Sequence, residues 1–253
     1  MVLHALSIGI DDFQDPSIRR LRYARKDAAA MAQLFERIAP EERSIHTLFD
    51  REATLRNVEK RVDDLCRNVS DEDVVLIYIA SHGTPERRSA TASLSAFLAL
   101  HDTEYAYIHA TGLDLELRLS DWMVRLEEAS FVAVILDTCF SGATGGRTFA
   151  RRLMGDGPPP RVSLRGLDLG RGSVILTAAD EAQVARESEA LGHGLFTYHL
   201  LEALQPPSGG PATIGVGALY ERVARAVSEA TEGQQRPILN GRSNLAALPL
   251  FPR

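Results

Sequence analysis

Two residues suited to nucleophilic chemistry follow two strand-like segments of this chain. His82 comes just after the apolar run Val74–Ala80, and Cys139, 57 residues further on, follows the run Phe131–Asp137. A thiolate is a far better nucleophile than a thiol, and a nearby imidazolium lowers the pKa of a cysteine from about 8.5 toward neutrality. The pair therefore predicts covalent catalysis, with Cys139 as the nucleophile and His82 as the group that protonates the leaving amine.

Glycines accompany both residues. Gly83 directly follows His82, and Gly142 lies three positions after Cys139. Glycine lets the backbone turn sharply and approach a ligand closely. The alternative is that Cys139 is a small buried residue at a strand end and His82 a turn histidine. That alternative is adequate for either residue alone, but it explains their joint placement less well.

Strand-like and helix-like segments alternate along the chain. Strand-length apolar runs occupy residues 3–10, 44–49, 74–80, 131–137 and 173–178, with a less regular one at 96–101. Apolar residues three and four positions apart predict helices near 24–38, 55–69, 119–128, 195–204 and 216–230. This alternation is typical of an α/β fold with a mostly parallel sheet. In such a sheet ligands bind beyond the carboxyl ends of the strands, where His82 and Cys139 are expected.

Several motifs in the chain resemble those of the caspase and metacaspase family of cysteine proteases, particularly its bacterial branch. They are Ile8-Gly-Ile-Asp11, Leu21-Arg-Tyr-Ala-Arg-Lys-Asp27-Ala, Ile79-Ala-Ser-His82-Gly83, Leu136-Asp137-Thr-Cys139-Phe-Ser-Gly142 and Gly194-Leu-Phe196-Thr197. The resemblance implies one caspase-like domain over 1–253, a three-layer α/β/α sandwich around a mostly parallel sheet of about six strands. It also implies that His82 and Cys139 form the catalytic dyad, and that the backbone N–H groups of Gly83 and Cys139 form the oxyanion hole.

One position departs from the animal caspases, which carry glutamine two residues before the cysteine. Here that residue is Asp137, and by resemblance to the metacaspases Asp137 and Asp27 form an acidic S1 pocket. Two carboxylates can accept the planar fork of an arginine guanidinium and would repel an aspartate, which predicts cleavage after arginine, with lysine second. The alternatives are that Asp27 caps a helix or pairs on its surface, for example with Arg22 or Lys26, and that Asp137 merely ends a strand.

Residues 143–172 differ in composition from the rest of the chain, because they are rich in glycine and arginine and contain three consecutive prolines. We expect a long loop there, joining a large-subunit-like part at 1–142 to a small-subunit-like part at 173–253. Arg147, Arg151 and Arg152 are candidate sites of activating cleavage, by the chain itself or by an upstream protease. The alternative is a basic loop that is not processed.

Composition narrows the class of protein. Hydrophobic residues make up 45% and charged residues 25%, which is typical of a globular protein. A net charge of -6 disfavours nucleic-acid binding, and the apolar runs are too short for a membrane helix. The first residues lack the features of a secretion signal. We expect a cytoplasmic monomer whose partners are proteins or peptides with a basic P1 residue, with no nucleic-acid or membrane partner.

Other residues able to bind metals or react fit structural roles better. Cys66 lies on the apolar side of the 55–69 helix, His101 and Asp102 follow a strand, and the acidic run at 71–73 is expected to be solvated. No metal ligands are predicted and no cofactor is required. Calcium is left open, because several metacaspases need it but the chain has no segment with the regular spacing of a calcium-binding loop.

Three hypotheses compete for the function. The first is an arginine-directed cysteine endopeptidase, activated by cleavage in 143–172 or by a partner, in a bacterial defence, stress or cell-death pathway. The second is a catalytically silent caspase-like scaffold that binds peptides or proteins. The third, a nucleotide-binding α/β domain, lacks the required phosphate-binding loops.

Overall fold

The computed structural model describes residues 1–38, 42–87, 94–140, 164, 169, 172–205, 214–241 and 247–248. The candidate processing residues Arg147, Arg151 and Arg152 lie outside the described residues, as do Gly142 and most of the segment 143–172.

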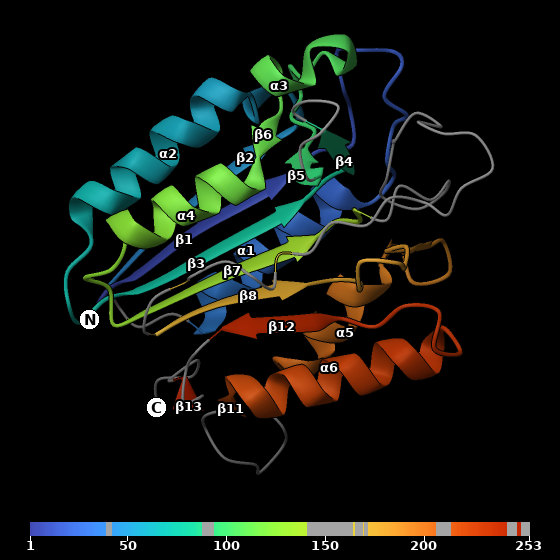
Figure 1. Cartoon of the computed structure of the whole chain (residues 1–253). Helices are drawn as coiled ribbons and strands as arrows, with labels where there is room; N and C mark the ends of the chain where they lie inside the picture. The colour runs from blue at the N-terminus through green and yellow to red at the C-terminus, as the bar shows by residue number, and fades with distance from the viewer. Residues whose placement is uncertain are drawn as a thin grey trace.

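A six-stranded sheet forms the centre of the molecule (Figure 1). Its strands are, in spatial order, β12 (Ile238–Gly241), β8 (Ser173–Thr177), β7 (Phe131–Asp137), β3 (Val74–Ala80), β1 (Leu3–Gly9) and β2 (Arg43–Phe49). Five of these strands are parallel, and β12 runs antiparallel to β8 at one edge. Every residue of β3 is buried, which explains its uninterrupted apolar sequence, because helices cover both faces of the sheet.

The helices form a layer on each face of the sheet (Figure 1). On one face lie α1 (Ala24–Ile38), α5 (Leu195–Ala203) and α6 (Val216–Ala230), and on the other lie α2 (Leu55–Asn68) and α4 (Leu115–Arg125). Each layer has its own apolar core against the sheet, centred on residues such as Met31 and Phe196 on the first face and Val58 and Trp122 on the second. The predicted three-layer α/β/α sandwich is confirmed.

Caps decide where two helices begin. The Thr54 side chain accepts a hydrogen bond from the backbone N–H of Asn57 at 3.2 Å and starts α2, as its sequence predicts. The Asp114 carboxylate accepts from the Leu117 N–H at 3.2 Å, so α4 begins four residues earlier than the apolar spacing indicated.

A small antiparallel sheet follows β3 directly, and the sequence predicted only one of its strands, the irregular one at 96–101, which the structure places at 94–98. It consists of β4 (Gly83–Arg87), β5 (Leu94–Leu98) and β6 (Leu113–Asp114). The strand β4 was not predicted because its sequence, Gly-Thr-Pro-Glu-Arg, has little apolar character. Because Gly83 pairs with Leu98, the backbone that follows His82 is extended, and this pairing fixes the positions of His82 and Gly83. The remaining elements are η1 (Asp50–Glu52), η2 (Tyr105–Tyr107), α3 (Ile108–Thr111), β9 (Glu187–Ser188), β10 (His193–Gly194), β11 (Ile214–Gly215) and β13 (Ala247–Leu248).

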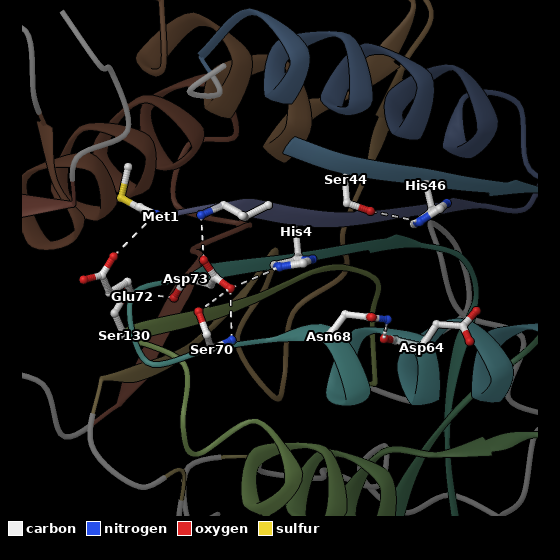
Figure 2. A network of polar contacts seen from close by, with 11 residues as sticks. Met1, His4, Ser44, His46, Asp64, Asn68, Ser70, Glu72, Asp73 and Ser130 are labelled. Atoms are coloured by element: carbon white, nitrogen blue, oxygen red, sulfur yellow. Dashed lines mark hydrogen bonds and ion pairs between the residues drawn. The ribbon is translucent and has the colours of Figure 1, made fainter. Parts of the chain in front are cut away.

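A polar network around Asp73 ties the amino end of the sheet together (Figure 2). The buried Asp73 carboxylate accepts hydrogen bonds from the backbone N–H groups of Val2 and Ser70 at 2.6 and 2.9 Å and from the Ser70 hydroxyl at 2.8 Å, and it pairs with His4 Nε2 at 3.4 Å. Burial opposes ionisation of this group, but the hydrogen bonds outweigh it and lower the pKa of Asp73 to about 2. Ser130, just before β7, donates to the Asp73 carbonyl, so one residue joins β1, β3 and β7.

Two further observations bear on the sequence-based expectations. Cys66 is half-buried against the apolar core on the α2 face, as predicted. Within the described residues, no helix combines the length and the apolar composition that crossing a bilayer requires.

Candidate active site

The register between β3 and β7 brings His82 and Cys139 to the same level. The strands are parallel neighbours, and Ala80 at the end of β3 pairs with Asp137 at the end of β7. His82 and Cys139 each follow two residues later, beyond the carboxyl edge of the sheet. This is where the topology of a parallel sheet predicts a site.

Gly83 shows how closely the two segments pack. A Cβ atom built on Gly83 would lie 2.6 Å from the carbonyl oxygen of Cys139, 2.6 Å from Thr138 Oγ1 and 2.5 Å from the ring of Phe140. No side chain fits at such distances, so residue 83 must be glycine for the backbone after His82 to lie against the backbone of Cys139. The structure thus brings together the three residues predicted for catalysis.

The imidazole of His82 is buried and oriented by a backbone carbonyl. Its Nε2 lies 2.7 Å from the carbonyl oxygen of Arg19, and the Phe13 ring packs beside it with a centroid separation of 5.5 Å. A carbonyl can only accept, so Nε2 carries the hydrogen and Nδ1 is the basic nitrogen of the neutral ring. Sequence analysis did not find the Arg19 contact, because every residue has a backbone carbonyl.

The thiol of Cys139 is covered by the loop that follows β8. Cys139 is 1% exposed, and its Sγ donates to the carbonyl oxygen of Gln183 at 3.1 Å. The Gln183 side chain is itself held by the carbonyl oxygen of Gly233 at 3.0 Å and the backbone N–H of Arg236 at 2.6 Å. The buried Gln235 side chain adds hydrogen bonds to both ends of the same loop, at the carbonyl oxygen of residue 178 and the backbone N–H of residue 186.

Asp137 belongs to a buried chain of hydroxyl groups. Its carboxylate is 1% exposed, and Oδ2 accepts from the Thr197 hydroxyl at 2.5 Å. The Tyr78 hydroxyl lies 2.5 Å from the same threonine oxygen. The single hydroxyl hydrogen of Thr197 goes to the carboxylate, so Tyr78 donates to Thr197. Asp137 therefore does more than end a strand.

Asp27 is fully buried at 0% exposure, and both of its oxygens are hydrogen-bonded. Oδ1 lies 2.6 Å from His193 Nδ1, and Oδ2 accepts from the Gly194 N–H at 3.0 Å. The alternative of a helix-surface pair with Arg22 or Lys26 is therefore wrong.

The two carboxylates predicted for the S1 pocket converge on the first turn of α5. His193 and Gly194 immediately precede this helix and hold Asp27, and Thr197 in its first turn holds Asp137. The positive end of the helix dipole at that turn further favours negative charge. The sequence gives no sign of this role for His193, since its partner Asp27 lies 166 residues earlier in the chain.

The remaining candidates have structural roles. His101 Nδ1 lies 2.7 Å from the carbonyl oxygen of Asp12, and the Asp102 carboxylate accepts from the Leu55 N–H at the start of α2 at 3.0 Å. Over the part of the chain that the structure describes, no group of three or more His, Cys, Asp or Glu side chains is placed to hold a metal ion.

Comparison with known proteins gives the family. The sequence profile of the caspase domain matches residues 3–248. The chain belongs to the caspase family. Among solved structures, the GSU0716 protein of Geobacter sulfurreducens is similar, with a TM-score of 0.69, 16% identity, and coverage of 96% of this chain and 94% of that one. Caspase-1 of Spodoptera frugiperda is also similar, with a TM-score of 0.63, 13% identity, and coverage of 100% and 92%.

These two structural likenesses are too distant in sequence to show more than the fold. A comparison with curated proteins finds no significant match. Family membership and fold are thus established, and the activity rests on the site.

Proposed function

We propose that this caspase-family protein is a cysteine endopeptidase that cleaves proteins after basic residues, arginine before lysine. The observation that carries the proposal is the placement of His82 beside Cys139 at the carboxyl edge of β3 and β7. The arginine preference is supported by Asp27 and Asp137, two buried carboxylates gathered at the start of α5.

The proposed reaction begins with transfer of the Cys139 thiol proton to Nδ1 of His82. The thiolate attacks the scissile carbonyl carbon, and the backbone N–H groups of Gly83 and Cys139 stabilise the oxyanion, each contributing on the order of a hundredfold in rate. His82 then protonates the leaving amine, and a water molecule activated by the same imidazole hydrolyses the thioester. The Arg19 carbonyl keeps the ring oriented through the hydrogen bond to Nε2.

The structure is that of a closed form of the site. Cys139 donates to the Gln183 carbonyl, and Asp27 and Asp137 are at most 1% exposed. A P1 side chain can reach these carboxylates after the loop containing Gln183 has moved. Cleavage after Arg147, Arg151 or Arg152, a partner protein or calcium is proposed as the trigger. We further propose that the protein acts as a cytoplasmic monomer in a bacterial defence, stress or cell-death pathway.

The proposal is tested with fluorogenic peptides that carry arginine, lysine or aspartate at P1. Wild-type protein is compared with Cys139→Ala, and Cys66→Ala serves as the matched cysteine control. The assays are run with and without calcium and after limited proteolysis of the segment 143–172. Hydrolysis after arginine that requires Cys139 but not Cys66 would support the protease and the acidic pocket. Cleavage after aspartate would retain the protease and reject that pocket.

The second candidate is a catalytically silent scaffold, and the closed geometry favours it. Both His82 and Cys139 are buried and hydrogen-bonded to backbone carbonyls, as expected of a site that does not open to a substrate. Absence of hydrolysis under every condition, including after cleavage of 143–172, would support a role in binding peptides or partner proteins.

A further inference from the structure

A cavity of about 540 Å³ with an excess of arginine side chains lies next to the candidate active site. One wall is the segment before α1 and the other is the segment around β9. The charged residues that line it are Arg19, Arg20, Arg22, Arg186, Glu187 and Glu189.

Each wall of the cavity belongs to a chain segment that contacts one residue of the catalytic pair. Arg19 supplies the carbonyl that binds His82. Arg186 lies three residues after Gln183, whose carbonyl accepts from the Cys139 thiol. The cavity is therefore built from the two chain segments whose backbone carbonyls contact His82 and Cys139.

The cavity also adjoins the proposed S1 carboxylates across a two-stranded hairpin. In this hairpin Glu187 of β9 pairs with Gly194 of β10. Glu187 faces the cavity, and the Gly194 N–H binds Asp27. One strand of this hairpin thus lines the cavity, and the other holds the carboxylate of Asp27.

The carboxylates in the wall leave the cavity positively charged. The Glu187 carboxylate accepts from the backbone N–H groups of Arg22 and Tyr23 at 3.3 and 3.0 Å, which joins the two walls. Glu189 forms a long ion pair of 3.5 Å with Arg22, in which the side chains are 85% and 67% exposed. Arg20 pairs outside the lining with Asp12 at 3.2 Å. Three carboxylates therefore lie against the four arginines of the lining, which leaves a smaller excess of positive charge.

Arg186 contributes most clearly to this excess. Its guanidinium donates to the neutral amide oxygen of Gln234 at 2.5 Å, and it has no carboxylate partner among the residues that the structure describes. A guanidinium bonded to a neutral amide keeps its full charge and retains donors for a carboxylate.

We propose that this cavity is a second substrate subsite, which binds an acidic side chain of the peptide near its basic P1 residue. This inference rests on the proposed protease function and narrows its substrates to peptides that carry aspartate or glutamate near the cleaved arginine. Arg186 is its principal specificity-determining residue, and Arg22 assists.

The test measures binding rather than cleavage, so it does not depend on activity. Fluorescent peptides with arginine at P1 carry glutamate, or glutamine as the isosteric control, at one flanking position at a time. Their affinity for full-length Cys139→Ala protein is measured by anisotropy. We expect glutamate at the favoured position to bind about three- to tenfold more tightly than glutamine at low salt, as for a few solvent-exposed ion pairs, and the difference to shrink at high salt.

Variants assign the effect to the cavity. Arg186→Gln, which removes the charge and leaves a shorter neutral amide, should remove most of the preference for glutamate. A further Arg22→Gln substitution should remove the rest. Arg56→Gln removes the same charge from an exposed position on α2, away from the cavity, and should leave the preference intact.

Three results would overturn the inference. They are equal binding of glutamate and glutamine peptides at every position, a preference that survives in the Arg186→Gln, Arg22→Gln double variant, and cleavage by the wild type after the acidic residue itself. Wild-type hydrolysis is measured in parallel with the same peptides. Hydrolysis after arginine without a glutamate preference would reject the subsite and keep the protease, and a glutamate preference in binding without hydrolysis would do the reverse.

Discussion

Substituting Gly83 by alanine perturbs the candidate site through geometry alone, since it adds one methyl group and no charge. The new Cβ would lie 2.5 to 2.6 Å from the Phe140 ring, the Cys139 carbonyl oxygen and Thr138 Oγ1. All three contacts are with residues 138–140, the segment that carries the proposed nucleophile. The strain therefore falls on the contact between the segments of His82 and Cys139.

The size of the effect follows from the distances. Ordinary carbon contacts lie at about 3.5 Å, so the two segments must move apart by about 1 Å. Overpacking of this kind costs about 1–3 kcal/mol of stability, which corresponds to a fall in Tm of roughly 4–8 °C for 2 kcal/mol in a domain of this size. A displacement of about 1 Å between reacting groups can reduce the rate about a hundredfold.

The assay is kcat/KM for an arginine-P1 peptide, measured with thermal unfolding on the same preparation of Gly83→Ala. Val58→Ala is the control, because Val58 is fully buried on the opposite α2 face and its truncation lowers stability without touching the site. We expect Gly83→Ala to lose about a hundredfold in kcat/KM and Val58→Ala to keep near-wild-type activity well below its Tm. Wild-type activity in Gly83→Ala would refute the close approach of the two segments.

Three further predictions follow from the polar contacts. The pKa of Asp73 is lowered to about 2, so the ionised carboxylate stabilises the fold above the ordinary pKa of 3.8, and this stabilisation is lost as the pH falls from 3.8 through 2. Asp73→Asn should therefore lower the free energy of unfolding by about 2 kcal/mol at neutral pH, measured by urea denaturation. An unchanged urea midpoint would contradict this. Thr197→Val leaves the Asp137 carboxylate without its hydroxyl donor and should reduce kcat/KM for arginine peptides about tenfold, mainly through KM. Thr197→Ser should restore the wild-type value, and equal activity of the two variants would rule out orientation of Asp137 by the hydroxyl. Gln235→Ala removes the hydrogen bonds that hold both ends of the loop over Cys139, so in a Cys66→Ala background it should increase the rate of thiol alkylation several-fold; an unchanged rate would mean that this loop does not control access to the thiol.

The amino-acid sequence alone was sufficient to predict the architecture and the catalytic candidates. Uninterrupted apolar runs such as β3 and β7 are typical of strands buried on both faces, and the amphipathic stripe of α6 predicted its bounds, Val216–Ala230. Since parallel strands end at one edge, placing His82 and Cys139 after two of them was enough to predict their proximity. These features are local or follow from topology, so the sequence carries a direct signal for them.

The tertiary structure decided the contacts of the site. The partners of His82 and Cys139 are the backbone carbonyls of Arg19 and Gln183, which any residue could supply. The roles of His193 and Thr197 depend on carboxylates 166 and 60 positions away in the chain.

The arginine-lined cavity likewise exists because two distant segments lie side by side, joined where Glu187 meets the backbone of Arg22, 165 residues earlier in the chain. The sequence shows arginines in both segments but not that they line one cavity. Spacing and periodicity reveal which residues share an element. Which backbone atoms and charges meet across elements depends on packing, and packing is a property of the whole fold.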